Sequence, residues 1–99
     1  MTEDLLNLKK YISVVHHVDG RIRLKVNPAI MKDPLSKKLG EISGSLPGVL
    51  DKRINMMAKS VVLRYDPSVV PPQDMQALLG SPDIEVSKKI LDKYKDLIK

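Results

Sequence analysis

The stretch His16-His17-Val18-Asp19-Gly20-Arg21-Ile22-Arg23-Leu24-Lys25-Val26 decides how the rest of this 99-residue chain is interpreted. Side chains along a β-strand point alternately to opposite faces of the sheet. In residues 21–26 the apolar side chains share one face: Ile22, Leu24 and Val26. The basic side chains share the other: Arg21, Arg23 and Lys25. This alternation predicts a half-buried strand whose outer face is cationic.

The dipeptide Asp19-Gly20 fits this stretch in two ways. It can be the turn of a two-residue hairpin that pairs residues 11–18 with residues 21–26. It can also be a bend or bulge within one long strand, where glycine tolerates unusual dihedral angles. An unbroken strand would place His16 on the buried face and His17 outside, and a one-residue bulge would exchange them. The sequence leaves both questions open.

Composition narrows the class of protein. A length of 99 residues fits one domain with its own core. The absence of cysteine excludes thiolate metal sites, cysteine nucleophiles and redox switches. With no Phe or Trp and only three Tyr, the core must be aliphatic residues and methionine. No apolar run approaches the roughly 20 residues of a membrane span, and the N-terminus lacks a signal-peptide pattern, so we expect a soluble cytoplasmic protein.

The order of the predicted elements indicates the fold class. Along the chain we expect a helical extension at 1–10, the strand region 11–26, a helix at 33–46, strands at 49–57 and 59–65, a short helix at 71–79, a strand at 81–86 and an amphipathic helix at 87–99. This succession is typical of the α+β class, and more narrowly of a ferredoxin-like βαββαβ fold with two helices on one face of an antiparallel sheet.

Residues 11–86 would form the domain, with the 87–99 helix packed on it. That helix could instead pair with a second copy and form a homo-oligomer. Its apolar stripe consists of Ile90, Leu91, Tyr94 and Leu97.

Residues 11–86 resemble the heavy-metal-associated (HMA) domains. The matching motifs are Leu46-Pro47-Gly48-Val49, Arg53-Ile54-Asn55, Ser60-Val61-Val62-Leu63-Arg64-Tyr65-Asp66-Pro67 and, as in a divergent cysteine-free branch, His17-Val18-Asp19-Gly20-Arg21-Ile22-Arg23-Leu24. The resemblance implies a ferredoxin-like fold and a place among soluble metal chaperones or N-terminal domains of metal-transporting P-type ATPases. HMA domains typically bind metal through a Cys-x-x-Cys pair after the first strand, whereas residues 27–33 contain no thiol here. The copper-chaperone mechanism therefore does not carry over.

The sequence offers two sets of candidate metal ligands. His16 and His17 could ligate an ion, but neighbouring residues of a regular strand point to opposite faces, so chelation by both would need a bulge. Four methionines could offer thioether ligands to Cu(I): Met31, Met56, Met57 and Met75. In a chain without Phe, we expect these methionines to fill the core instead.

The basic residues form the stronger candidate site. If residues 21–26 lie beside residues 60–65, then Arg21, Arg23, Lys25, Arg53 and Arg64 share the sheet face away from the helices. An anionic ligand, the carboxylates of a protein partner or a phosphate-bearing surface would relieve their repulsion. RNA-binding domains of this fold stack bases on aromatic residues of that face. Here Tyr65 is expected on the helix-covered face, which disfavours nucleic acid.

No motif for enzymatic catalysis is present, so we expect a non-catalytic protein. The leading hypothesis is an HMA-like adaptor or regulatory domain of metal transport or storage. It would dock on a P-type ATPase or a metal-storage assembly through Arg21, Arg23 and Arg64. The alternative is direct binding of a transition metal ion, such as iron, or of a metal cofactor through His16 and His17. A second alternative is non-specific nucleic-acid binding by the basic face.

Overall fold

A four-stranded antiparallel sheet organises the computed structural model, which describes residues 2–97. Its strands are β1 (Ile12–Val18), β2 (Arg21–Val26), β3 (Val49–Asn55) and β4 (Ser60–Tyr65). They lie side by side in the order β1-β2-β4-β3, so β1 and β3 form the two edges. Residues 21–26 therefore lie beside residues 60–65, as the sequence predicted.

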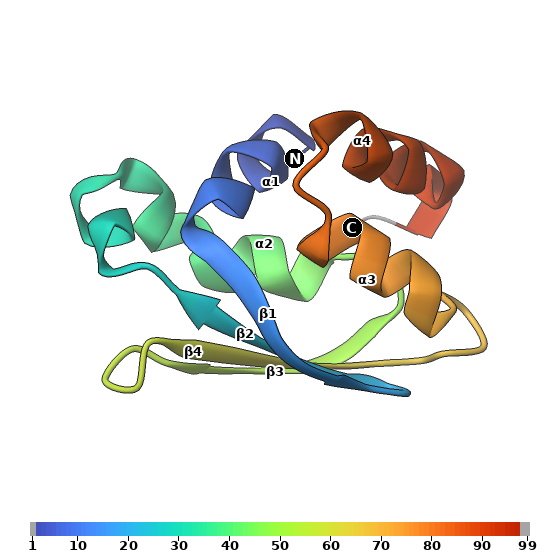
Figure 1. Cartoon of the computed structure of the whole chain (residues 1–99), viewed down its shortest axis with the longest axis horizontal. Helices are drawn as coiled ribbons and strands as arrows, with labels where there is room; N and C mark the ends of the chain where they lie inside the picture. Colours follow the sequence, from blue (N-terminus) through green and yellow to red (C-terminus); the bar gives the residue numbers. More distant parts are fainter. Residues whose placement is uncertain (1, 98–99) are drawn as a thin grey trace.

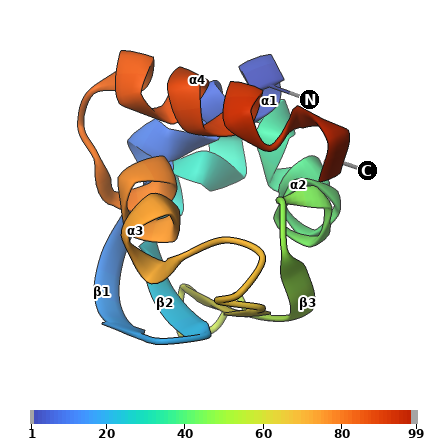
Figure 2. The ribbon, with the colours of Figure 1, turned by 90° about the vertical axis from the view of Figure 1, so that its right-hand side faces the viewer.

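The α-helices all lie on one side of this sheet (Figure 1). They are α1 (Thr2–Leu8), α2 (Leu39–Ser45), α3 (Pro72–Gly80) and α4 (Ile84–Lys93). Helix α2 lies against β3 and α3 against β1, while α4 packs over α3 and α1 in the outer layer (Figure 2). None of the helices in residues 2–97 is long and apolar enough to cross a membrane.

The predicted α+β class with helices over one face of an antiparallel sheet is confirmed, but the predicted order of elements is wrong in one place. Residues 81–86 do not form a strand, because α4 begins within them at Ile84. The Asp83 side chain caps this helix by accepting a hydrogen bond from the Glu85 N–H at 2.9 Å. Strand β1, from the N-terminal part of the chain, occupies the sheet edge beside β2 instead. Between α1 and α4, the order of strands and α-helices is thus strand-strand-helix-strand-strand-helix.

Short 3₁₀ turns connect the regular elements. The predicted helix at 33–46 is split into a 3₁₀ turn at Pro34–Lys38 and α2 at Leu39–Ser45. Asp33 caps the start of the 3₁₀ turn by accepting a hydrogen bond from the Leu35 N–H at 2.9 Å. Further 3₁₀ turns lie at Lys9–Tyr11, Pro28–Lys32 and Lys95–Leu97.

The core lies between the sheet and the helices and is aliphatic apart from one tyrosine and one methionine. Alternate residues of β2 and β4 supply its floor: Ile22, Leu24, Val26, Val61, Leu63 and Tyr65. Helix residues cover this floor, with Leu39 and Ile42 from α2 and Met75, Leu78 and Leu79 from α3. Leu5 and Leu8 of α1 and Leu91 of α4 are buried as well, so both of these helices are anchored to the core.

A partly buried polar link joins α4 to the 3₁₀ turn that follows α1. The Lys9 ammonium donates to the Ser81 carbonyl at 2.6 Å and to the Ser87 hydroxyl, which itself donates to the Leu78 carbonyl at 2.9 Å. Ser87 is fully buried. Burial lowers the pKa of Lys9, although the nearby Asp83 carboxylate acts in the opposite direction.

Candidate functional site

The face of the sheet opposite the helices carries three rows of side chains, and each row takes one residue from each of the four strands. The first is Val18-Arg21-Arg64-Asp51, the second is His16-Arg23-Val62-Arg53, and the third is Ser13-Lys25-Ser60-Asn55. We call the five basic members of these rows the arginine face: Arg21, Arg23, Lys25, Arg53 and Arg64. All five are exposed, and they include every arginine of the chain.

The arginine face holds like charges close together. Arg21 and Arg64 are directly opposite each other in the antiparallel pair of β2 and β4. Among residues 2–97, the ion pairs within 4.0 Å all join lysines to carboxylates elsewhere, and none involves these arginines. Asp51 of β3 is the register partner of Arg64, and it is the one acidic residue in the three rows. The face is therefore cationic and has unused capacity for hydrogen bonding to anions.

Part of the arginine face is hollowed. A depression of about 240 Å³ is lined by Arg21, Asp51, Arg53, Val62 and Arg64. Half-buried Val62 is the short residue among long neighbours, which explains why the surface sinks at this point. The sequence predicted the three arginines of this site but not Asp51 and Val62. Val62 alternates with the buried Val61 and Leu63 of β4, and Asp51 lies two residues before Arg53 on β3, so strand alternation was a usable signal for both.

The structure decides both questions that Asp19-Gly20 raised. The dipeptide is the two-residue turn of the β1–β2 hairpin, with Val18 opposite Arg21 and Gly20 at φ +83°. A bulge lies between Val14 and His16, which oppose consecutive residues of β2, so that Val15 is the extra residue. His16 therefore joins the arginine face opposite Arg23, and His17 turns toward the helices.

His17 is held by two side chains that are distant in sequence. Its Nε2 lies 2.6 Å from the Tyr65 hydroxyl, and its Nδ1 lies 2.8 Å from Gln76 Oε1. Both contacts are satisfied when Nδ1 carries the proton and the hydroxyl donates to Nε2. Burial raises the pKa of Tyr65, so this phenol remains a donor at neutral pH.

These positions do not assemble a metal site from the histidine pair. His16 and His17 lie on opposite faces of the sheet, and both nitrogens of His17 have protein partners. No group of three His, Asp or Glu side chains within residues 2–97 is arranged to hold a metal ion. The expectation that the methionines fill the core is confirmed for Met75, and Met56 is partly buried against the core. The expectation is wrong for Met31 and Met57, which lie in connecting turns and are 59% and 96% exposed.

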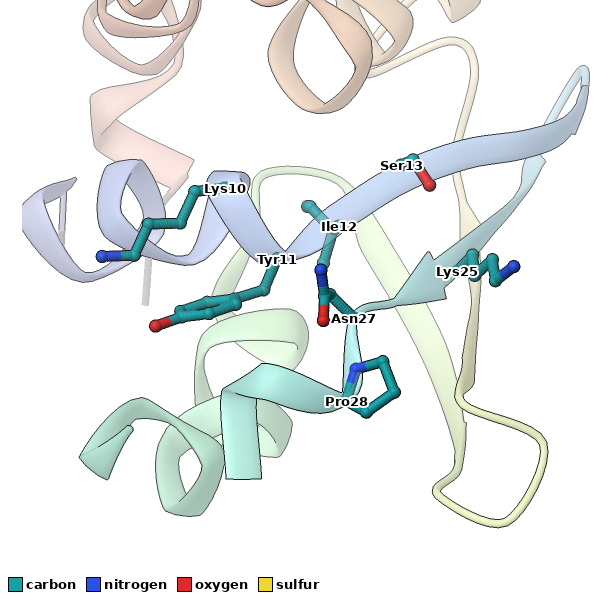
Figure 3. A pocket seen from close by; sticks show the side chains of 7 residues that line it. All are labelled: Lys10, Tyr11, Ile12, Ser13, Lys25, Asn27 and Pro28. Atoms are coloured by element: carbon teal, nitrogen blue, oxygen red, sulfur yellow. The ribbon is translucent and has the colours of Figure 1, made fainter. Parts of the chain in front are cut away.

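A second depression, of about 460 Å³, lies where the chain enters β1 and leaves β2 (Figure 3). Its two lysines, Lys10 and Lys25, extend in opposite directions and do not converge on a common point. The Tyr11 hydroxyl is engaged, because it donates to Asp33 at 2.8 Å, and this bond is the main reason why the pKa of Tyr11 is raised. This depression therefore lacks the convergent polar groups of a binding site.

The arginine face and its depression thus form the candidate site, with a geometry suited to an anionic partner. No protein-family model matches this chain, and neither does any curated protein or solved structure.

Proposed function

We propose that this chain is a non-catalytic adaptor or regulatory domain that docks through its arginine face on an acidic surface of a protein partner. The observation that carries the proposal is the position of all four arginines on the sheet face opposite the helices. The arginines come from β2 and from the β3–β4 hairpin, which lies well beyond β2 in the sequence. A solvated basic surface built for solubility alone would not need to concentrate one residue type in this way.

The energetics of the face favour a partner with carboxylates. Like charges opposite each other on neighbouring strands are destabilising, as for Arg21 and Arg64. A bound carboxylate would remove that repulsion. Guanidinium groups also hold carboxylates and phosphates through two parallel hydrogen bonds, which lysine cannot do. The preference for arginine on this face therefore supports specific recognition of oxyanions.

A nucleic-acid partner is less well supported by the same residues. Binding of single strands relies on aromatic side chains that stack against bases. The three rows of the face contain no Tyr, and His16 is their sole aromatic ring. Tyr65 is buried on the opposite side of β4.

The resemblance to HMA domains supports a more specific partner. A metal-transporting P-type ATPase or a metal-storage assembly would place this adaptor in metal transport or storage. This assignment rests on the sequence motifs at 17–24 and 46–67.

Binding to defined polyanions tests the docking mode. Fluorescence anisotropy would compare labelled polyglutamate with single-stranded DNA of equal charge, using the wild type, Arg21→Gln/Arg23→Gln and Lys89→Gln/Lys95→Gln. The two double variants lose the same charge from exposed positions, so their comparison distinguishes an effect of the arginine face from an effect of the net charge of the protein.

We expect the arginine variant to lose polyglutamate binding on the order of tenfold or more, and the lysine variant to remain near wild type. Equal losses in both variants would mean that net charge alone attracts anions. DNA binding tighter than polyglutamate binding would favour the nucleic-acid alternative.

A further inference from the structure

We infer that the depression between Arg21, Arg53 and Arg64 binds a phosphoryl group carried by the docking partner, so that docking depends on phosphorylation of that partner. The inference rests on the proposed docking function and names the group that anchors it.

The arrangement of the three arginines favours a tetrahedral group. Arg21 comes from β2, Arg64 from β4 and Arg53 from β3, so their side chains approach the depression from three strands. Neighbouring strands are about 4.8 Å apart, and Arg21 and Arg53 also lie one row apart along the strands, so their Cα atoms are on the order of 12 Å apart. Two arginine side chains can span that distance and meet at one anion. A phosphoryl group offers three acceptor oxygens in different directions, whereas a carboxylate offers two in one plane.

The charge of the depression also matches a phosphoryl group. Three guanidinium groups and the Asp51 carboxylate line it, which gives a net charge of +2. A phosphorylated side chain carries about −1.5 to −2 at pH 7, whereas a Glu or Asp side chain carries −1. The phosphoryl group thus neutralises the depression, and a carboxylate leaves about half of its charge uncompensated.

The depression is large enough for a phosphoryl group but too small to enclose a whole small molecule. Its volume of about 240 Å³ is below the roughly 300–1,000 Å³ of pockets that enclose whole small molecules. The remaining positive residues, Arg23 and Lys25, continue along β2 away from the depression. A phosphorylated side chain at the depression, followed by acidic residues along β2, would fit this distribution of charge.

Three peptides of one acidic sequence test the inference. They differ at one position, which is phosphoserine, glutamate or serine, and their binding to the full chain is measured by fluorescence anisotropy. The variants Arg53→Gln and Arg64→Gln each remove one guanidinium group. Arg64→Lys keeps the positive charge but lacks the planar guanidinium group, and Lys89→Gln on α4 is the control. Circular dichroism confirms that each variant is folded.

We expect wild type to bind the phosphoserine peptide on the order of tenfold tighter than the glutamate peptide. Arg53→Gln and Arg64→Gln should abolish that preference, Arg64→Lys should reduce it, and Lys89→Gln should retain it. Equal binding of the phosphoserine and glutamate peptides would overturn the inference and leave acidic docking intact. Failure of all three peptides to bind would overturn the docking function as well. Displacement of the phosphopeptide by an equal concentration of inorganic phosphate would show that the depression selects free phosphate rather than a phosphorylated partner.

Discussion

His17 Nε2 lies 2.6 Å from the hydroxyl of Tyr65, and this hydrogen bond joins the edge strand β1 to β4 across the intervening β2. The two rings are tilted by 54° with their centroids 5.8 Å apart. Gln76 of α3 holds the other ring nitrogen at 2.8 Å. The edge strand is thus fastened to both the sheet and a helix at the end of the hairpin that carries Arg21.

Replacing Tyr65 with Phe should destabilise the domain by about 1 kcal/mol, because it leaves His17 Nε2 without its donor. Urea denaturation measures the change in the free energy of unfolding, and the ¹⁵N shifts of the His17 ring report its tautomer. Tyr11→Phe is the matched control, since its hydroxyl bonds Asp33 and not the histidine. Tyr11→Phe should leave the His17 shifts unchanged. If Tyr65→Phe also leaves them unchanged, the link is absent in solution.

The bulge at Val15 gives a second prediction. Val14 and His16 oppose the consecutive residues Leu24 and Arg23, so deletion of Val15 would restore a regular ladder and keep His17 on the helix-covered face. We expect the deletion variant to fold and to keep the His17–Tyr65 contact, as judged by a nuclear Overhauser effect between the two rings.

Deletion of Val62 is the control for this experiment. Val62 has register partners on both sides, Arg23 on β2 and Arg53 on β3, so its loss would reverse the faces of β4. That variant should unfold. Loss of the His17–Tyr65 contact on deleting Val15 would show that the bulge is needed for this register.

The elements that the sequence predicted well are those with an unambiguous period. Residues 21–26 alternate basic and apolar side chains, and both faces are as expected. Residues 81–86 were misassigned because Ile84 and Val86 also alternate over a short span, and only the Asp83 cap distinguishes a helix start there. The sequence could not show that β1 fills the edge of the sheet, since such a choice depends on competition between distant segments.

The sequence predicted the arginines of the candidate site but not the positions of the two histidines. The arginines followed from strand alternation, whereas the faces of the histidines did not, because Val14 and Val15 are identical residues and give no sign of the bulge at Val15. The partners of His17 are 48 and 59 residues away in sequence, and they are brought to it by the strand order of the sheet for Tyr65 and by the packing of α3 for Gln76.

Gly48 gives a prediction about the entry to β3. Its φ is +75°, and a Cβ there would lie 2.8 Å from Val70 Cγ2, while its carbonyl accepts the Asp66 N–H at 2.9 Å. Gly48→Ala should therefore destabilise the domain by more than about 1 kcal/mol. Gly40→Ala is the matched control. Gly40 lies in α2, and a Cβ there would make an ordinary contact at 3.5 Å with the Ile54 side chain.

Alanine favours a helix by up to about 1 kcal/mol over glycine, so Gly40→Ala should leave stability unchanged or raise it. Thermal denaturation of both variants measures the contrast. Equal effects at the two positions would contradict the strained backbone at Gly48.

The last prediction concerns acid stability and rests on Asp74. Its carboxylate accepts from the Tyr94 hydroxyl at 2.5 Å and from the Lys93 ammonium at 2.9 Å, which ties α3 to the end of α4. The Tyr94 bond, followed by the Lys93 bond, lowers the pKa of Asp74 below its ordinary value. Its contribution to stability is thus fully present above the pKa of the unfolded chain, near 4, and is lost as the pH falls through the folded pKa.

Asp74→Asn should therefore be less stable than wild type at neutral pH, and the difference should shrink as the pH falls below about 4. Urea denaturation across this range measures it. Asp92→Asn is the control, since it removes the same charge from an exposed position on α4. Asp33 and Asp66 also have lowered pKa values, so both variants keep some acid dependence. A difference between Asp74→Asn and wild type that stays constant with pH would show that the amide disturbs packing rather than removing a charge-dependent bond.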